Sequence, residues 1–172
     1  MDPVQKSEVP SDGLLSDCLP RFDFADAYSL PISDEQAADI DGLARAAFQH
    51  LPNWILILMK LRNLLVGPLG LKTTYDTTSN FLVGPLEVGS RVGIFRVYGR
   101  TPTEILMGED DKHLDFRVSL RVEGLRGNKQ VLVATVVCFN SGLGRFYLAL
   151  VRPFHKVIVP AVMRQSLTKN TF

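Results

Sequence analysis

The chain has 172 residues, 46% of them hydrophobic, and a formal net charge of +1. This length suits one domain with a sizeable buried core, and the balanced charge excludes the concentrated basic face that captures nucleic acid. The two cysteines lie far apart and form no metal-ligand spacing with histidine. We therefore expect reduced thiols in a cytoplasmic protein, with neither a disulfide scaffold nor a metal site.

The first part of the chain predicts a tail, a strand and a helix. Residues 1–20 are rich in proline and show little periodicity, which predicts a flexible tail ahead of a single domain over 21–172. The polar, acidic start does not have the pattern of a secretory signal. The stretch Ala27–Ile32 predicts a short strand. Ser33 then begins a helix, because Gln36 follows three residues later, as a capping box requires.

A second helix is expected from Pro52 to Val66, where the chain is apolar almost all round, as in helices that are buried on most sides. The window Trp54–Leu71 is the most apolar in the chain. It contains Lys60 and Arg62 and is interrupted by glycine and proline, so we expect a buried helix there rather than a membrane span. A long connection over 72–91 follows.

From Val92 onward the pattern is typical of β-strands. Val92–Arg100 and Glu104–Asp110 predict the first two. In His113–Glu123 apolar and polar residues alternate strictly, which predicts a half-buried antiparallel strand. Gln130–Asn140 is apolar on both faces, so we expect this strand to be covered on both sides.

The segment Leu143–Leu167 predicts one long C-terminal helix that kinks or restarts at Pro153 and Pro160. Apolar residues recur in it at helical spacing, which predicts an inward-facing stripe. The expected stripe consists of Tyr147, Leu150, Phe154, Val157 or Ile158, and Ala161. The order of elements predicts an α+β fold in which a curved antiparallel sheet wraps on the final helix, with the space between them as the default pocket.

Three stretches carry a resemblance to known families over about residues 21–168. They are "W…LMKLRNLLVGPLGL" from Trp54, "GEDDKHLDFRVSL" from Gly108 and "LGRFYLALVRPFHKVIVPAVM" from Leu143. With them the chain resembles the bacterial domain-of-unknown-function family 2867. The order of elements is similar to the helix-grip fold of the START and birch-pollen-allergen (SRPBCC) superfamily, with six or seven strands and two shorter helices.

This resemblance implies a pocket but no reaction. Members of the family occur alone or joined to a nicotinamide-binding short-chain dehydrogenase domain, which implies a reductase partner or a homodimer. The chain itself contains no GxGxxG motif and no Rossmann alternation, so we expect no bound dinucleotide and no other cofactor.

Two interpretations of His113 and Asp115 remain open. Glycine and aspartate are turn residues, so the stretch "GEDDKH" forms the polar corner of a hairpin in the first interpretation. In the second, His113 works with Asp111 or Asp115 at the pocket mouth as a proton-transfer pair. A β-bulge would be needed to turn such a side chain inward.

Other candidate ligand-binding residues lie on the helices. Arg62 falls within an apolar face, where it either forms a buried ion pair or holds an acidic head group. His155 either caps a helix segment or faces solvent, or else it contacts a ligand. The aromatic residues that either fill the core or line the pocket are Trp54, Phe116, Tyr147 and Phe154.

Three functions fit these observations. The first is a domain that binds a small apolar or lipid-like ligand in an apolar cavity, with Arg62 and His113 as polar contacts. The second is an enzyme of the cyclase, dehydratase or hydrolase kind that uses a histidine–carboxylate pair. The third is an interaction module for a short-chain dehydrogenase or for a second copy of the chain. No nucleophile motif is present, so no catalytic residue is assigned.

Overall fold

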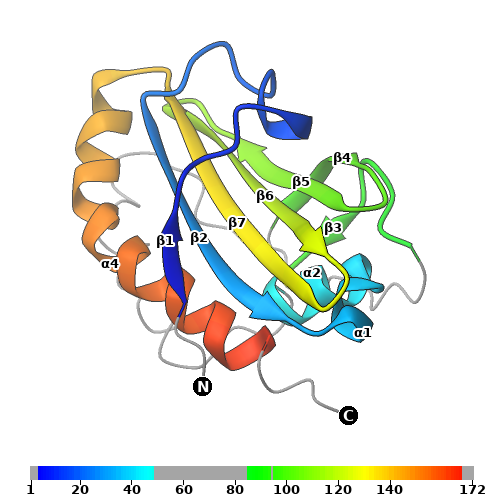
Figure 1. The fold of residues 1–172 in the computed structure, drawn as a ribbon. Helices are drawn as coiled ribbons and strands as arrows, with labels where there is room; N and C mark the ends of the chain where they lie inside the picture. Colours follow the sequence, from blue (N-terminus) through cyan, green and yellow to red (C-terminus); the bar gives the residue numbers. More distant parts are fainter. Residues whose placement is uncertain (1–3, 49–84, 94, 168–172) are drawn as a thin grey trace.

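The computed structural model describes residues 4–48, 85–93 and 95–167 (Figure 1). They form an α+β fold with one curved antiparallel sheet of seven strands, in the order β1-β2-β7-β6-β5-β4-β3. The strands are β1 (Gln5–Ser7), β2 (Phe24–Ile32), β3 (Arg91–Val92), β4 (Phe95–Arg100), β5 (Glu104–Asp110), β6 (Leu114–Leu125) and β7 (Asn128–Phe139). The helices are the 3-10 turn η1 (Gly13–Leu15), α1 (Asp34–Ala37), α2 (Ile40–Phe48) and the long C-terminal α4 (Gly142–Leu167). The predicted α+β class, strand number and final helix are confirmed.

The two longest strands, β6 and β7, form a hairpin at the centre of the sheet. Their register runs from Leu114 opposite Phe139 to Leu125 opposite Asn128. The chain turns between them at Gly127, whose φ of 81° favours glycine. The alternation in β6 places its apolar side chains on one face of the sheet, the inner face, and its polar side chains on the other, the outer face. This predicted alternation is confirmed.

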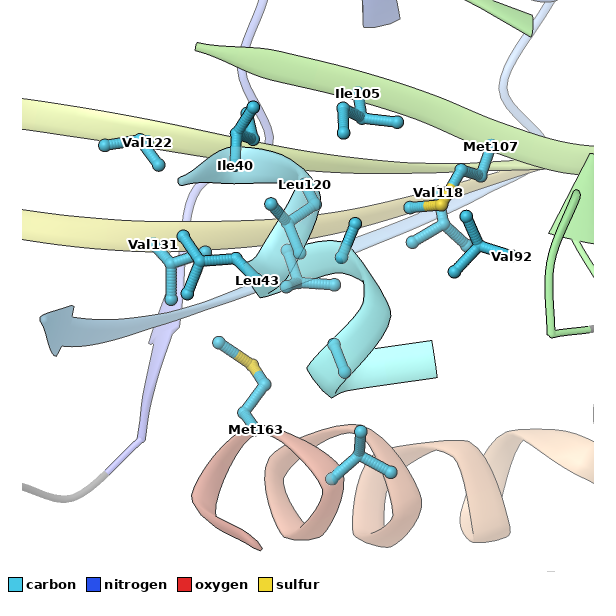
Figure 2. Close-up of a cluster of buried hydrophobic side chains, with 14 of the residues drawn as sticks. Ile40, Leu43, Val92, Ile105, Met107, Val118, Leu120, Val122, Val131 and Met163 are labelled. Atoms are coloured by element: carbon cyan, nitrogen blue, oxygen red, sulfur yellow. The ribbon is translucent and has the colours of Figure 1, made fainter. Parts of the chain in front are cut away.

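The core lies between the inner face and the helices α2 and α4 (Figure 2). Ile105, Leu120 and Val131 of the sheet are fully buried. Leu43 of α2 and Met163 of α4 point toward them and are 5% and 1% exposed. Because α2 and α4 also contact each other, the two helices form one layer on the inner face.

Ser33 begins α1 as predicted. Its hydroxyl accepts a hydrogen bond from the Gln36 amide, and the Gln36 side chain accepts one from the Ser33 amide. The expected single helix is nevertheless divided in two. Asp39 starts α2 by accepting a hydrogen bond from the Gly42 amide at 2.8 Å, which is the role of a helix N-cap.

The N-terminal segment, for which the sequence predicts a flexible tail, packs on the outer face. β1 pairs with β2, and Leu15 is fully buried among outer-face side chains of β5 and β7. The buried Glu104 carboxylate accepts hydrogen bonds from the Leu14 amide at 3.0 Å and from the Ser119 hydroxyl at 2.7 Å. This difference has a physical cause: β7 is apolar on both faces, so its outer face must also be covered.

Asp12 binds the same segment to β6. Its carboxylate oxygens accept hydrogen bonds from the Arg121 guanidinium at 2.7 and 3.2 Å. This hydrogen bonding, together with the charge of Arg121, holds the pKa of Asp12 below its ordinary value of 3.8. Because the pKa is lowered in the folded state, the contribution to stability is present above pH 3.8 and is lost as the pH falls through the lower folded-state pKa.

We therefore expect Asp12→Asn to flatten the pH dependence of the free energy of unfolding below about pH 4. Urea titrations of both proteins between about pH 3 and 6 measure that dependence. Arg121→Gln removes the same interaction from the other side, together with the 3.2 Å ion pair between Arg121 and Glu123, and should flatten the curve at least as much. If the free energy of unfolding of Asp12→Asn depends on pH as steeply as that of the wild type, the Asp12–Arg121 interaction does not cause this pH dependence.

The C-terminal helix runs through both of its prolines as a single helix. Ile158 of the predicted inward stripe packs against the core, but the other large aliphatic and phenylalanine members of the stripe face outward. Leu150, Phe154 and Val157 are 36%, 39% and 61% exposed. The side that faces the sheet carries His155 and Met163 instead. Because α4 is apolar on both sides, the spacing of apolar residues could not determine which side packs on the sheet.

Candidate functional site

One carboxylate lies on the inner face of the sheet among apolar side chains. Asp26 is the third residue of β2, and the two-residue period of a strand puts it on the same face as Phe24 and Tyr28. Asp26 is 8% exposed, and its register partner on β7, Thr135, is 6% exposed. A buried carboxylate is costly unless it is paired, so the chemistry of this site depends on the partners of Asp26.

His155 reaches Asp26 from α4. The distance from His155 Nε2 to Asp26 Oδ1 is 3.1 Å, although the two residues are 129 positions apart in the chain. The Phe24 ring meets the imidazole edge to face, with 6.1 Å between the ring centroids. The Arg152 guanidinium lies 5.6 Å from the centroid of the same phenyl ring. The pair therefore joins β2 to the final helix beside an aromatic side chain.

The second carboxylate oxygen of Asp26, Oδ2, is buried and has no hydrogen-bond partner in the described part of the chain. Burial, and secondly the charge of Asp26, raise the pKa of Tyr28, so the phenol stays neutral at physiological pH. The site thus combines a carboxylate oxygen that can accept a hydrogen bond with an imidazole, a phenol and the Thr135 hydroxyl. Such a set can bind a ligand hydroxyl or amino group, and the imidazole can also transfer a proton.

The acidic turn between β5 and β6 binds the start of α4. Asp115 Oδ1 accepts a hydrogen bond from the Asp111 amide at 3.1 Å, and Asp111 Oδ1 accepts one from the His113 amide at 3.3 Å. His113 Nδ1 lies 3.0 Å from the Ser141 hydroxyl, which also accepts a hydrogen bond from the Gly144 amide at 3.3 Å. These are the contacts of a hairpin corner and a helix cap, as in the first interpretation of this stretch.

The structure does not bring His113 and Asp115 together with His155. Asp115 lies on the outer face, opposite Cys138 in the register. His113 contacts Ser141 just before α4, whereas His155 lies about four helical turns, roughly 20 Å, further along. The histidine–carboxylate contact on the inner face is made by His155 and Asp26. Within the described ranges, no group of three His, Cys, Asp or Glu side chains could hold a metal ion.

Phe116 lies on the inner face as part of an aromatic group. Its ring packs edge to face on Phe95 at 5.8 Å between centroids, and Phe95 meets Phe48 of α2 in the same way at 5.4 Å. Phe116 and Phe24 both pair with Val137, from opposite sides of β7. The aromatic group and the Asp26–His155 pair therefore lie at the same end of the inner face.

The remaining predicted site residues lie elsewhere or outside the described part of the chain. Tyr147 is half-buried on α4. Phe154 is 39% exposed, on the side of α4 away from the sheet. Trp54 and Arg62, with the helix predicted for 52–66, fall outside the described residues, so their roles stay predictions.

Asp26 is the site residue that the sequence did not reveal. The strand was predicted to start at Ala27, three residues after its observed start at Phe24, so Asp26 was not assigned to a face of the sheet. The available signal was an aspartate between Phe24 and Tyr28, at the spacing that puts all three on one side of a strand. A charge in that position of an apolar strand indicates a buried partner or a ligand.

A family model described as "Protein of unknown function (DUF2867)" matches residues 18–162. The matched range contains both Asp26 and His155. No curated protein matches the chain, and no solved structure matches it. Because the match spans most of the sequence, the chain belongs to this family, DUF2867.

Proposed function

We propose that the protein is a helix-grip domain that binds a small amphipathic molecule between the inner face of the sheet and α4. The observation that supports the proposal is Asp26 Oδ2, a buried carboxylate oxygen that has no hydrogen-bond partner among the described residues. Leaving a buried acceptor unsatisfied costs about 1–3 kcal/mol, and more when the group is charged. A ligand that donates a hydrogen bond to Oδ2 would remove this cost on binding.

The surroundings of Asp26 support one class of ligand. Phe24 and Phe116 offer apolar contacts at the same end of the inner face. Because His155 already occupies Oδ1, the ligand head group is a donor of hydrogen bonds, a hydroxyl or an amine. A ligand carboxylate would be repelled by Asp26.

A series of ligands with one chain length tests this proposal. Octylamine, octanol and octanoate share an apolar chain and differ in the head group. We expect octylamine to bind at least about tenfold more tightly than octanoate, because a hydrogen bond to a charged acceptor contributes about 1.5–3 kcal/mol. Isothermal titration calorimetry on the full chain measures the three dissociation constants.

Asp26→Asn should abolish the preference for octylamine over octanoate, since it removes the charge and keeps the shape. Asp115→Asn is the matched control, because that carboxylate lies on the outer face of the same sheet, and the preference should persist. The proposal that the ligand head group donates a hydrogen bond to Asp26 would be refuted if octanoate bound most tightly. It would also be refuted if Asp26→Asn still preferred octylamine over octanoate.

The same pair favours a second candidate function, acid–base catalysis. A carboxylate 3.1 Å from an imidazole nitrogen fixes the ring orientation and stabilises the imidazolium. With Nε2 held by Asp26, Nδ1 of His155 is the atom that would exchange a proton with a substrate. Here the enzymatic pair is His155 with Asp26, in place of the His113 pair expected from the sequence.

A further inference from the structure

The outward side of α4 is a second apolar face. Four large apolar residues recur along it at intervals of three or four, so they form one stripe. The members of this outer stripe are Phe146 (62% exposed), Leu150 (36%), Phe154 (39%) and Val157 (61%). The opposite side of the helix carries His155 and Met163, which bind Asp26 and the core. The outer stripe is therefore not needed to attach α4 to the sheet.

The charges of α4 all have one sign. The stretch from Gly142 to Leu167 contains no aspartate and no glutamate. Arg145, Arg152 and Lys156 are exposed and are spaced by seven and four residues, which places them in one row along α4. At 3.6 residues per turn this basic row follows the other edge of the exposed side of the helix, roughly a third of a turn from the outer stripe. Arg145 and Arg152 lie over the Phe139 and Phe24 rings, so the packing of α4 on the sheet holds this basic row in place.

We propose that α4 docks the protein on the surface of a membrane that contains anionic lipid. The outer stripe would enter the boundary between head groups and acyl chains, and the basic row would contact the lipid phosphates and carboxylates. A helix with one apolar face and a basic flank is suited to lie in the membrane interface. An anionic membrane surface complements both parts of the helix, because it offers an apolar layer to the outer stripe and negative charge to the basic row.

The helix would lie on the membrane rather than cross it. By length and composition α4 could span a bilayer, and it is the one helix of the described residues that meets this weak criterion. Its inward side, however, contributes Val162 and Met163 to the core, and its His155 binds buried Asp26. Crossing a bilayer would expose that core and break the pair, whereas docking flat uses only the outward side. Figure 1 shows α4 at the periphery of the described fold.

Vesicle co-sedimentation of the full chain tests the proposal. One set of vesicles is phosphatidylcholine alone, and the other contains about one-third phosphatidylserine as the anionic lipid. We expect binding to the second set only, and weaker binding at high salt. Arg145→Gln, Arg152→Gln and Lys156→Gln together should lower the partition constant about a hundredfold. Phe146→Ser with Val157→Ser should lower it at least tenfold.

Matched controls come from the opposite side of the fold. Leu125→Ser removes an exposed apolar residue of the β6–β7 turn. Arg96→Gln, Arg126→Gln and Lys129→Gln remove the same amount of charge away from α4. Both controls should bind vesicles like the unaltered chain. Equal losses in controls and α4 variants would overturn the proposal, as would absence of binding. So would a dimer in sedimentation velocity that Phe146→Ser with Val157→Ser dissociates, because a second copy would then cover the stripe.

Discussion

His155→Leu is expected to lower the free energy of unfolding by about 3 kcal/mol, because it leaves the Asp26 carboxylate buried without its partner. Asp26 is 8% exposed, and the imidazole is the group that meets its Oδ1. Leucine is close to histidine in volume and can still pack on Phe24. The loss therefore comes from the uncompensated charge rather than from a cavity.

A double variant distinguishes the loss that comes from an unpaired Asp26 carboxylate from the loss that comes from altered packing. Replacing both partners, His155→Leu with Asp26→Val, should recover most of the lost stability, since a buried ion pair replaced by packed apolar side chains is often neutral or stabilising. Urea titration of the wild type, the two single variants and the double variant completes the cycle. His113→Leu is the matched control: it removes a hydrogen bond to Ser141 but strands no buried charge, and should cost about 1 kcal/mol. A double variant as unstable as His155→Leu would show that packing of the imidazole dominates.

This comparison also bears on function. If the apolar pair is as stable as the native one, then Asp26 and His155 are not required for folding. A buried polar pair that the fold does not need, with one carboxylate oxygen unsatisfied among the described residues, is typical of a site kept for a ligand or for catalysis.

Local patterns predicted the elements of this fold well. Alternation in His113–Glu123 and apolar runs in the neighbouring segments predicted β4 to β7 within a few residues of their observed bounds. Ser33 and Gln36 predicted the start of α1, because a capping box depends only on residues three apart. These signals are contained within single elements, so the rest of the chain does not change them.

Features that depend on distant contacts were not predictable in the same way. The Asp26–His155 pair forms between residues 129 positions apart and requires the register of β2 on β7 and the rotation of α4. The rotation itself was ambiguous, because Phe154 and Met163 both belong to apolar stripes of α4. The packing of the N-terminal segment was not predicted for a related reason: the buried Leu15 and the partly buried Leu14 and Leu19 follow no helix or strand period.

Gly144→Ala should lower the free energy of unfolding by about 2 to 3 kcal/mol, although alanine is the better helix former. A Cβ at this position would lie 2.2 Å from the His113 carbonyl oxygen and 3.4 Å from Leu114 Cβ. That carbonyl cannot move freely, because it accepts a hydrogen bond from the Asn140 amide at 2.9 Å. The start of α4 would therefore have to separate from the β5–β6 corner.

Gly142→Ala, two residues earlier, should instead raise the free energy of unfolding. No atom lies within 4 Å of a Cβ at Gly142, so the substitution should stabilise the protein by up to about 1 kcal/mol through helix propensity and reduced freedom of the unfolded chain. Thermal and urea unfolding of the two variants give the comparison directly. If Gly144→Ala destabilises the protein and Gly142→Ala stabilises it, the start of α4 packs directly on the turn that contains His113. This contact then sets the rotation of α4 that places His155 next to Asp26. If Gly144→Ala is also stabilising, the start of α4 does not pack tightly on this turn. The position of His155 must then be fixed further along the helix, where Val162 and Met163 pack in the core.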